Sequence, residues 1–427
     1  MTAGAGTDQA KLRRTIEAVW RIESPKLIGA LVRFVRDVGL AEELAQDALL
    51  AAMEQWPRDG VPDNPGAWLM TAAKRRAVDL LRQRAMAERK RDELAREAGG
   101  SEALGDSPAE RIDAQLDDPV GDDLLRLMFV ACHPVLSKEA RAALTLRLLG
   151  GLTTEEIARG FLSSEPTIAQ RIVRAKKTLA EEKVPFEVPR GEALAERLPS
   201  VLEVIYLVFN EGYAATSGRD WMRPELCDEA LRLGRILAAR IDDEPEVLGL
   251  LALMELQASR LRARVGPDGE PVLLLDQNRA LWDRGQIERG LRTLRRALRL
   301  PNANGPYVTQ AAIAACHARA RTAEQTDWRQ IAAIYDGLSE RSPSPVVELN
   351  RAVAHGMAFG PEAGLALAEQ LKDEPALEGY HLLHVVLGDL LEKVGRREDA
   401  REEFARAAAL TKNERERQVL QRRATQV

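Results

Sequence analysis

Cysteine, histidine and aromatic residues are scarce in this chain of 427 residues, which has three cysteines, five histidines and 4% aromatic residues. The cysteines (Cys132, Cys227 and Cys316) form no CxxC spacing, which argues against a disulfide framework and a thiolate zinc site. This cysteine usage predicts a reducing, cytoplasmic location. The low aromatic content and few β-branched runs argue against a β-sandwich or β-barrel.

Long apolar runs and common catalytic motifs are also missing. No apolar stretch reaches the length of about 18 residues needed for a membrane span. Residues 1–9 lack the basic and apolar segments of a signal peptide. The chain has no GxGxxG, GxxxxGK[ST] or GxSxG motif, so we expect neither an enzyme nor a bound cofactor. His381 and His384 could make half a metal site, but packing or surface roles are the stronger interpretation.

What is abundant favours helices. Ala, Leu, Arg and Glu dominate, and the chain is 45% hydrophobic and 30% charged. This composition predicts an all-α protein, and the length predicts two to four domains of roughly 100–200 residues each. A net charge of -5 taken alone disfavours a polyanionic partner, but the charge is unevenly distributed along the chain.

Two basic segments flank an acidic one. Residues 67–96 contain nine Lys or Arg against four Asp or Glu, and residues 159–177 contain five against one. Between them, residues 97–123 contain nine acidic residues and one arginine, together with several Gly and Pro. Such a stretch buries little apolar surface, so we interpret residues 97–121 as a flexible acidic linker.

The segment 10–96 reads as several helices interrupted between residues 56 and 65, where prolines and a glycine cluster. The helix over 40–56 is expected to bury Leu44, Ala48 and Met53. The opposite face should be acidic and exposed, and it could dock on a basic partner or simply be solvated. This face carries Glu42, Glu43, Gln46 and Asp47.

A second helix is expected over 67–84, opened by Trp68. Its core stripe is predicted to be Leu69, Ala73, Ala77 and Leu80. Arg75, Asp79 and Arg82 share another face. A basic helix beside an aromatic ring suits unpaired DNA, because arginines attract phosphates and bases stack on rings. The alternative is a solvated helix whose tryptophan belongs to the core.

A helix-turn-helix is predicted from Thr153 to Leu179. Thr153 and Glu156 have the spacing of a capping box, and Ser164 can cap the second helix with Pro166 in its first turn. That helix places its apolar residues on one stripe, namely Ile168, Ile172, Ala175 and Leu179. Its polar face could enter a DNA major groove. An ordinary helical hairpin with a charged surface is the alternative.

The chain after Pro185 and Pro189 is not a basic platform, because residues 186–427 contain 33 Lys or Arg against 37 Asp or Glu. Successive helices are expected, with a hairpin around residues 265–269. From about residue 307 the spacing of small and large residues is typical of a tetratricopeptide repeat, and residues 415–423 suit a polar capping helix. The clearest copy contains Gly388, Leu391, Ala400, Phe404 and Ala407.

The order of these motifs carries a family resemblance. The runs AEELAQD (41–47), WL (68–69) and AKRRAVD (73–79) resemble region 2 of the extracytoplasmic-function sigma factors. The runs LTTEEIA (152–158) and TIAQRIVRAKKTL (167–179) resemble their region 4. The chain after residue 186, including FNEGY at 209–213, looks like the long C-terminal extension of one subgroup.

The resemblance implies a sigma factor without chemistry of its own that directs core RNA polymerase to promoter DNA. Region 2, at 10–96, would bind the polymerase and the -10 element, and region 4, at 122–184, the -35 element. The implied -10 residues are Trp68, Lys74, Arg75, Arg76, Asp79, Arg82 and Arg84. The implied -35 residues are Ser164, Thr167, Gln170, Arg171, Arg174 and Lys177. The implied polymerase-binding residues are Glu42, Glu43, Gln46 and Asp47.

The C-terminal part, 186–427, is expected to be a further partner that docks on the sigma module and regulates it, and a separate regulatory protein is also possible. No membrane partner is expected. Two other functions fit part of the sequence. One is a one-component helix-turn-helix regulator with a tetratricopeptide sensor, which leaves residues 10–96 unexplained. The other is a tetratricopeptide scaffold whose basic helices are merely surface.

Overall fold

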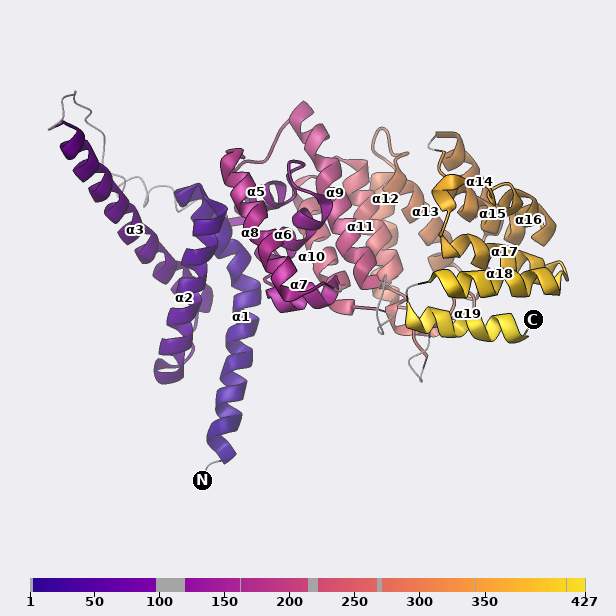
Figure 1. The fold of residues 1–427 in the computed structure, drawn as a ribbon, viewed down its shortest axis with the longest axis horizontal. Helices are drawn as coiled ribbons and strands as arrows, with labels where there is room; N and C mark the ends of the chain where they lie inside the picture. Colours follow the sequence, from indigo (N-terminus) through magenta and orange to yellow (C-terminus); the bar gives the residue numbers. More distant parts are fainter. Residues whose placement is uncertain are drawn as a thin grey trace. The chain divides into compact units, whose positions relative to one another are not determined.

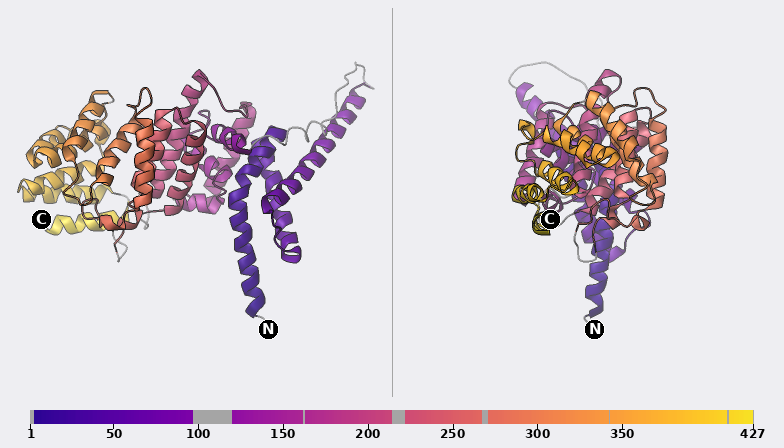
Figure 2. Two further views of the ribbon diagram at one scale, coloured as in Figure 1. Left: turned by 180° about the vertical axis from the view of Figure 1, so that it is seen from behind. Right: turned by 90° about the vertical axis from the view of Figure 1, so that its right-hand side faces the viewer.

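The computed structural model describes residues 3–96, 120–161, 163–213, 222–266, 271–341, 343–411 and 413–426. These residues are predominantly helical, as Figures 1 and 2 show, and the expected all-α class is confirmed. The chain divides into two compact units, Met1–Val204 and Ile205–Val427. In the described part of the chain, none of the helices is both long and apolar enough to span a bilayer.

The first unit begins with three helices: α1 (Ala3–Val35), α2 (Val38–Asp59) and α3 (Pro65–Arg96). Asp37 caps α2 by accepting a hydrogen bond from the Leu40 N–H at 2.9 Å. The helix ends at Gly60, whose φ of 85° suits a residue without a side chain. Asn64 in turn accepts a bond from the Ala67 N–H at 3.0 Å and so caps α3. The expected interruption between residues 56 and 65 is therefore present.

The buried stripe of α2 differs from the expected one. Leu44 and Ala48 are buried, but Met53 is 41% exposed, so this prediction was wrong for the methionine. The stripe continues instead through Ala52 and Trp56, which lie four and eight residues beyond Ala48 on the same face of the helix. Residue 53 is one step further around the helix and points outward.

Four helices follow in the same unit: α5 (Val120–Ala131), α6 (Lys138–Leu148), α7 (Thr154–Gly160) and α8 (Glu165–Glu181). Because α5 begins at Val120, the last residues of the expected acidic linker are helical, and Asp123 is buried rather than solvated. Its carboxylate lies 2.9 Å from Arg126 and 3.8 Å from Arg33 of α1, and these charges offset its burial. The rest of the linker prediction, residues 97–119, lies outside the described residues.

The first half of α9 (Glu192–Tyr213) also packs within this unit. The Ser200 hydroxyl donates to the carbonyl of Cys132 at 2.5 Å and accepts a hydrogen bond from Arg141. Arg197 donates to the carbonyl of Phe129 at 2.7 Å, and Lys138 pairs with Glu203 at 2.5 Å. Residues 192–204 therefore complete the core that α5 and α6 begin.

The second unit contains the rest of α9 and a succession of helices. These are α10 (Pro224–Arg240), α11 (Pro245–Ala258), α12 (Arg284–Ala297), α13 (Pro306–Arg319), α14 (Trp328–Arg341), α15 (Pro345–Phe359), α16 (Pro361–Glu369), α17 (His381–Lys393), α18 (Arg397–Leu410) and α19 (Glu414–Gln426). The short 3-10 helices are η1 (Leu261–Ala263), η2 (Arg279–Leu281) and η3 (Pro375–Leu377). An antiparallel bridge joins Val265 to Pro271 where a hairpin was expected, and residues 267–269 of that prediction lie outside the described residues.

The motif at 209–213 holds α9, α10 and η1 together. Phe209 is buried and stacks on Tyr213, with ring centroids 5.6 Å apart. The Tyr213 hydroxyl accepts a bond from Arg260 at 2.6 Å, and the Arg264 guanidinium lies 3.7 Å from the centre of its ring. Cation–π contact and hydrogen bonding together fix the end of α9 against the chain that follows α11.

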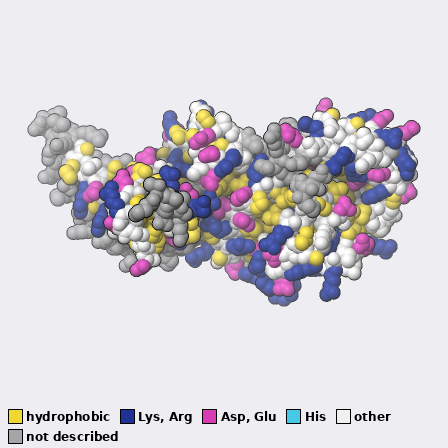
Figure 3. Space-filling model, turned by 90° about the horizontal axis from the view of Figure 1, so that it is seen from below, with side chains coloured by type: hydrophobic (Ala, Val, Ile, Leu, Met, Phe, Trp, Pro, Cys, Tyr) yellow, Lys and Arg dark blue, Asp and Glu magenta, His cyan; other side chains and the backbone are white. Residues whose placement is uncertain are grey.

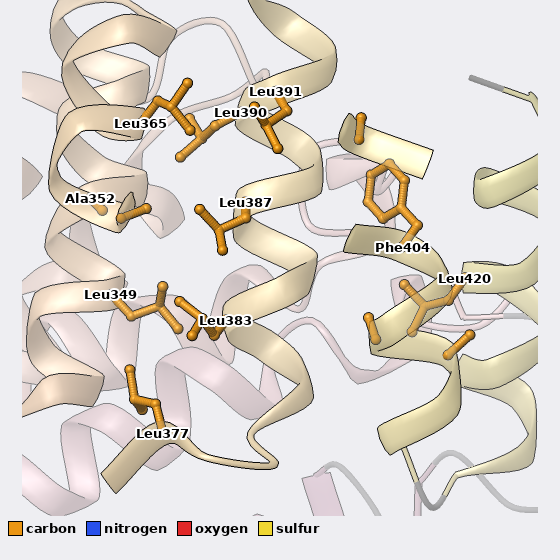
Figure 4. Close-up of a cluster of buried hydrophobic side chains, with 14 residues drawn as sticks. Leu349, Ala352, Leu365, Leu377, Leu383, Leu387, Leu390, Leu391, Phe404 and Leu420 are labelled. Atoms are coloured by element: carbon orange, nitrogen blue, oxygen red, sulfur yellow. The ribbon is translucent and has the colours of Figure 1, made fainter. Parts of the chain in front are cut away.

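The repeat spacing near the C-terminus has the packing role expected of it. Gly388 of α17 faces Phe404 of α18, and a Cβ at residue 388 would lie 2.6 Å from the ring. Phe404 and Leu387 are both fully buried, and Figure 4 shows the leucines of α17 among those of neighbouring helices. The small residue allows the two helices to approach closely, as in repeat proteins. Helix α19 covers the end of the stack, with Leu420 buried.

We predict that Gly212→Ala destabilises the second unit. A Cβ at residue 212 would lie 2.6 Å from the backbone nitrogen of Cys227 and 2.9 Å from the carbonyl of Arg223, so backbone would have to move. The expected loss is about 1–3 kcal/mol in the free energy of unfolding, measured by urea titration with circular dichroism. Gly285→Ala is the control, because its new Cβ would lie no closer than 3.4 Å to another group. Equal unfolding free energies for wild type and Gly212→Ala would contradict the packing argument.

Candidate nucleic-acid interface

The helix-turn-helix is built by the local signals that the sequence contains. The Thr153 hydroxyl accepts a bond from the Glu156 N–H at 3.1 Å, and the Glu156 carboxylate accepts one from the Thr153 N–H at 2.8 Å. This reciprocal capping box starts α7. Ser164 caps α8, accepting from the Thr167 N–H at 3.3 Å, and Pro166 occupies the first turn as expected. Both helices thus begin where the pattern placed them.

The two faces of α8 separate as predicted. Its apolar stripe is buried, with Ile168 fully covered and Ile172, Ala175 and Leu179 at most 4% exposed. Thr167, Gln170, Arg174 and Lys177 are exposed, and Arg171 is half-buried. Thr167, Gln170, Arg171 and Arg174 line one depression of about 350 Å³ with the start of α6. Ser164 lies at the N-terminal end of the helix, where its hydroxyl meets that of Thr167 at 2.7 Å.

One side chain on this face was missed by sequence reasoning. Val173 is 64% exposed, although it is apolar and sits on a well-packed helix. It lies three residues after Gln170 and four before Lys177, so it shares their face. The exposure of Val173 could have been predicted from the sequence, because residue 173 does not belong to the apolar stripe formed by Ile168, Ile172, Ala175 and Leu179. An exposed aliphatic group among basic residues suits contact with a thymine methyl group.

The basic helix α3 presents a second charged face. Arg75, Asp79 and Arg82 are exposed, while Leu69, Ala73 and Ala77 are buried and Leu80 is half-buried. Trp68 is half-buried and meets the buried Trp56 edge-to-face, with ring centroids 5.5 Å apart. The tryptophan therefore contributes to the packing of α2 on α3 and keeps part of its surface accessible. Lys74 is half-buried, and the side chain of Arg84 lies outside the described residues.

The acidic residues of α2 do not form one exposed face. Glu43 and Asp47 are exposed, and Gln46 is half-buried. Asp47 lies 3.5 Å from Arg76 of α3, so one residue of the acidic set is paired with one of the basic set. Both partners are about half exposed, and such surface pairs contribute little to stability.

Glu42 was expected to be exposed, and this prediction was wrong. Its side chain is only 4% exposed because the face of α2 that carries it packs on α8. The carboxylate accepts a hydrogen bond from Arg147 Nε at 2.6 Å, pairs with Lys176 and accepts a bond from Gln46 at 2.8 Å. A single carboxylate of α2 is thus held by one cation of α6, Arg147, and one of α8, Lys176.

The electrostatics of Glu42 follow from this setting. Burial works to raise the pKa of its carboxyl, but Lys176 and Arg147 outweigh burial, so the pKa lies below its ordinary value. A depressed pKa stabilises the folded state above the ordinary pKa of glutamate, and this stabilisation is lost as the pH falls through the lowered value. Arg21 and Glu156 add a further contact between the two segments at 2.6 Å.

Figure 3 shows one face of the molecule, on which Lys and Arg side chains occur beside Asp and Glu side chains. No group of three or more His, Cys, Asp or Glu side chains close enough to bind a metal occurs among the described residues. His384 contacts Glu403 at 2.6 Å and His381 contacts Glu416 at 3.1 Å. Each histidine thus has a carboxylate partner, which fits packing roles.

Comparison with known families agrees with this architecture. Residues 20–86 match Sigma-70 region 2, residues 126–179 match Sigma-70 region 4, and residues 197–298 match a family of unknown function (DUF6596). An uncharacterized protein of Rhizobium meliloti is 45% identical over 91% of this chain and 90% of its own length.

Curated sigma factors are similar to a part of the chain. ECF RNA polymerase sigma factor SigK of Mycobacterium ulcerans is 30% identical over 36% of this chain and 78% of its own length. The probable ECF RNA polymerase sigma factor SigI of Mycobacterium tuberculosis is 26% identical over 40% of this chain and 57% of its own length. The chain therefore belongs to the extracytoplasmic-function sigma factors of the sigma-70 family, and it carries a long helical C-terminal extension.

Proposed function

We propose that this protein binds core RNA polymerase, directs it to promoters and performs no chemistry of its own. The observation that carries the proposal is the presence, in one sigma-family chain, of two capped helices with exposed cationic faces, α3 and α8. Co-elution with core polymerase on size exclusion, followed by run-off transcription, tests it. Promoter binding without any association with the polymerase would instead support a one-component regulator.

The two helices suit two physical states of DNA. Helix α8 suits a duplex, because its Gln170, Arg171 and Arg174 can reach base edges and phosphates in a major groove. We assign it, with Ser164, Thr167 and Lys177, to the -35 element. Helix α3 suits a strand held unpaired, because arginines attract its phosphates and the accessible part of Trp68 offers an apolar surface to a base. We assign it to the -10 element.

For the polymerase we retain Glu43, Gln46 and Asp47 as the docking face, since these three keep accessible surface. Glu42 is committed to Arg147 and Lys176, so its direct contact with the polymerase would first require those ion pairs to break. The charge of the remaining face is suited to steering a basic partner surface into place.

We further propose that the C-terminal part regulates the sigma module. A domain tethered to its target is present at roughly millimolar effective concentration, so even a weak contact would be occupied. The stacked helix pairs of α13–α18 are of the kind that present extended binding surfaces. Residues 192–204 pack against α5 and α6. A displacement of the chain after residue 204 could therefore be transmitted through α9 to the segment that we assign to the -35 element.

Arg171→Ala and Arg174→Ala are each expected to weaken -35 binding by roughly 1–3 kcal/mol, because each removes a contact to a phosphate or base edge. Fluorescence anisotropy with holoenzyme and labelled promoter measures the loss. Arg295→Ala, an exposed arginine of α12, is the control for a general loss of positive charge. Unchanged affinity in the double variant would refute the assignment of α8.

Glu43→Lys combined with Asp47→Lys should impair association with core polymerase, because like charges would then meet at the docking face. Folding should persist, since both side chains are exposed. A quantitative pull-down of core subunits measures the effect. Asp59→Lys combined with Asp63→Lys gives the same charge change at two other exposed acidic residues. If both pairs reduce recovery equally, Glu43 and Asp47 do not form the docking face.

A chain ending at Val204 is expected to initiate transcription with a different rate and salt dependence from the full chain, because it keeps the contacts of α9 with α5 and α6 but lacks the C-terminal unit. Circular dichroism first establishes that the shortened chain is folded. Run-off transcription over a range of salt concentrations is the measurement. Identical initiation, with no binding between the separated parts at tens of micromolar, would rule out regulation by the C-terminal unit.

A further inference from the structure

A cavity of about 600 Å³ lies in the first unit, between the turn that joins α1 to α2 and the end of α8. This volume falls in the range of small-molecule sites, roughly 300–1,000 Å³. Apolar side chains make up much of its wall, and the buried ones include Val32, Val38, Val130 and Leu179. An apolar wall with a few polar groups is the usual composition of a ligand site.

The polar groups in the wall are almost all cationic. Four are basic, namely Arg33, Arg36, Lys176 and Lys183, and one is acidic, Asp37. The Asp37 carboxylate is engaged in capping α2. Lys176 is held by Glu42 at the inner wall. Two further cations, Arg36 and Lys183, are exposed and form no ion pair with any residue in the described part of the chain.

The backbone at these two cations is unusual. Arg36 has a φ of 51° and Lys183 a φ of 49°, and Asn302 is the third non-glycine residue with positive φ in the part of the chain that the structure describes. Each cation follows the end of a helix, where glycine is the preferred residue because a side chain is unfavourable in the left-handed conformation. Two cations thus occupy strained positions at the rim of one cavity. Strain of this kind clusters at functional sites.

We propose that this cavity binds an amphipathic organic anion, with a phosphate or carboxylate head between Arg36 and Lys183 and an apolar body against Val130 and Leu179. Guanidinium and ammonium groups form charge-assisted hydrogen bonds with such heads. The apolar wall adds the hydrophobic contribution that an inorganic ion cannot make. The ligand class is therefore a small anion with an aromatic or aliphatic body.

The site has a regulatory consequence, which rests on the proposed function. Arg36 follows α1, within the region 2 segment, and Lys183 follows α8, within the region 4 segment. An anion held by both would stabilise the arrangement in which Glu42 pairs with Lys176, because a ligand stabilises the state that binds it. Direct contact of Glu42 with the polymerase would require this ion pair to break. Bound anion should therefore reduce promoter-dependent initiation.

Isothermal titration calorimetry of the full chain with 1-naphthyl phosphate, 1-naphthoate, 1-naphthol and inorganic phosphate tests the site directly. We expect the two naphthyl anions to bind about tenfold more tightly than either inorganic phosphate or the uncharged naphthol, because each of these lacks one half of the recognition. The ratio between 1-naphthyl phosphate and 1-naphthoate identifies the preferred head group.

Arg36→Gly and Lys183→Gly are the decisive variants. Both relieve the left-handed backbone, so Tm should stay equal or rise while the affinity for 1-naphthyl phosphate falls about tenfold in each. Asn302→Gly is the matched control, since it relieves the same backbone conformation in the second unit and should leave the affinity unchanged. A merely structural role for the two cations would lower Tm and not affect binding selectively.

The site is refuted if 1-naphthyl phosphate binds no better than inorganic phosphate, or if Asn302→Gly weakens it as much as Arg36→Gly does. It is also refuted if a short duplex of unrelated sequence displaces the naphthyl anion, because the cations would then serve the DNA backbone. Run-off transcription with 1-naphthyl phosphate addresses the consequence separately. Unchanged initiation beside intact calorimetric binding would overturn the regulatory consequence alone, and a wild-type chain inactive without ligand would overturn the proposed function.

Discussion

A buried carboxylate organises the N-terminal unit. Glu42 is withdrawn from water on α2, and a buried charge is tolerated only where opposite charges and hydrogen bonds compensate it. Arg147 and Lys176 provide that compensation from α6 and α8. Arg147 also donates to the carbonyl of Leu152 at 3.1 Å, in the turn that precedes the helix-turn-helix. One carboxylate therefore fixes α2, the end of α6 and α8 together.

The C-terminal unit depends on a different device, the close approach of helices at residues that lack a side chain. Gly212 lets α9 contact the backbone at the start of α10, and Gly388 lets α17 meet the ring of Phe404. Larger residues at these points would separate the helices and expose the apolar side chains between them. The arginines around Tyr213 add charge-assisted and cation–π contacts to this framework.

Ion pairing also determines which basic side chains of the candidate interfaces are accessible. Arg75, Arg82 and Arg174 are exposed on well-packed helices, so they are available to a polyanion while the opposite faces maintain the fold. Arg76 and Lys176 are instead paired with Asp47 and Glu42, and are correspondingly less available. The proposed anion site adds Arg36 and Lys183, which pair with no described residue and stand beside an apolar wall. Whether a basic side chain can bind an anionic partner thus depends on whether a carboxylate of the same chain already pairs with it.

Features that depend on residues near one another in sequence could be predicted. The capping box at Thr153, the cap at Ser164 and the apolar stripe of α8 arise from spacing within one or two turns, and each is found where it was expected. The helical repeats near the C-terminus are equally local, because Gly388 and Phe404 lie on consecutive helices. The family resemblance followed from the order of these local motifs.

Features that depend on which surfaces meet could not be predicted. Periodicity identifies one apolar face of α2, but it cannot indicate that a second face packs on α8, so Glu42 appeared solvated. The cavity beside Arg36 and Lys183 joins residues almost 150 positions apart, and the left-handed backbone that holds both cations leaves no pattern in the sequence. Sequence alone determined the helices and their charge, whereas the tertiary structure decided which charges are buried, paired or available, because burial and pairing depend on contacts between distant segments.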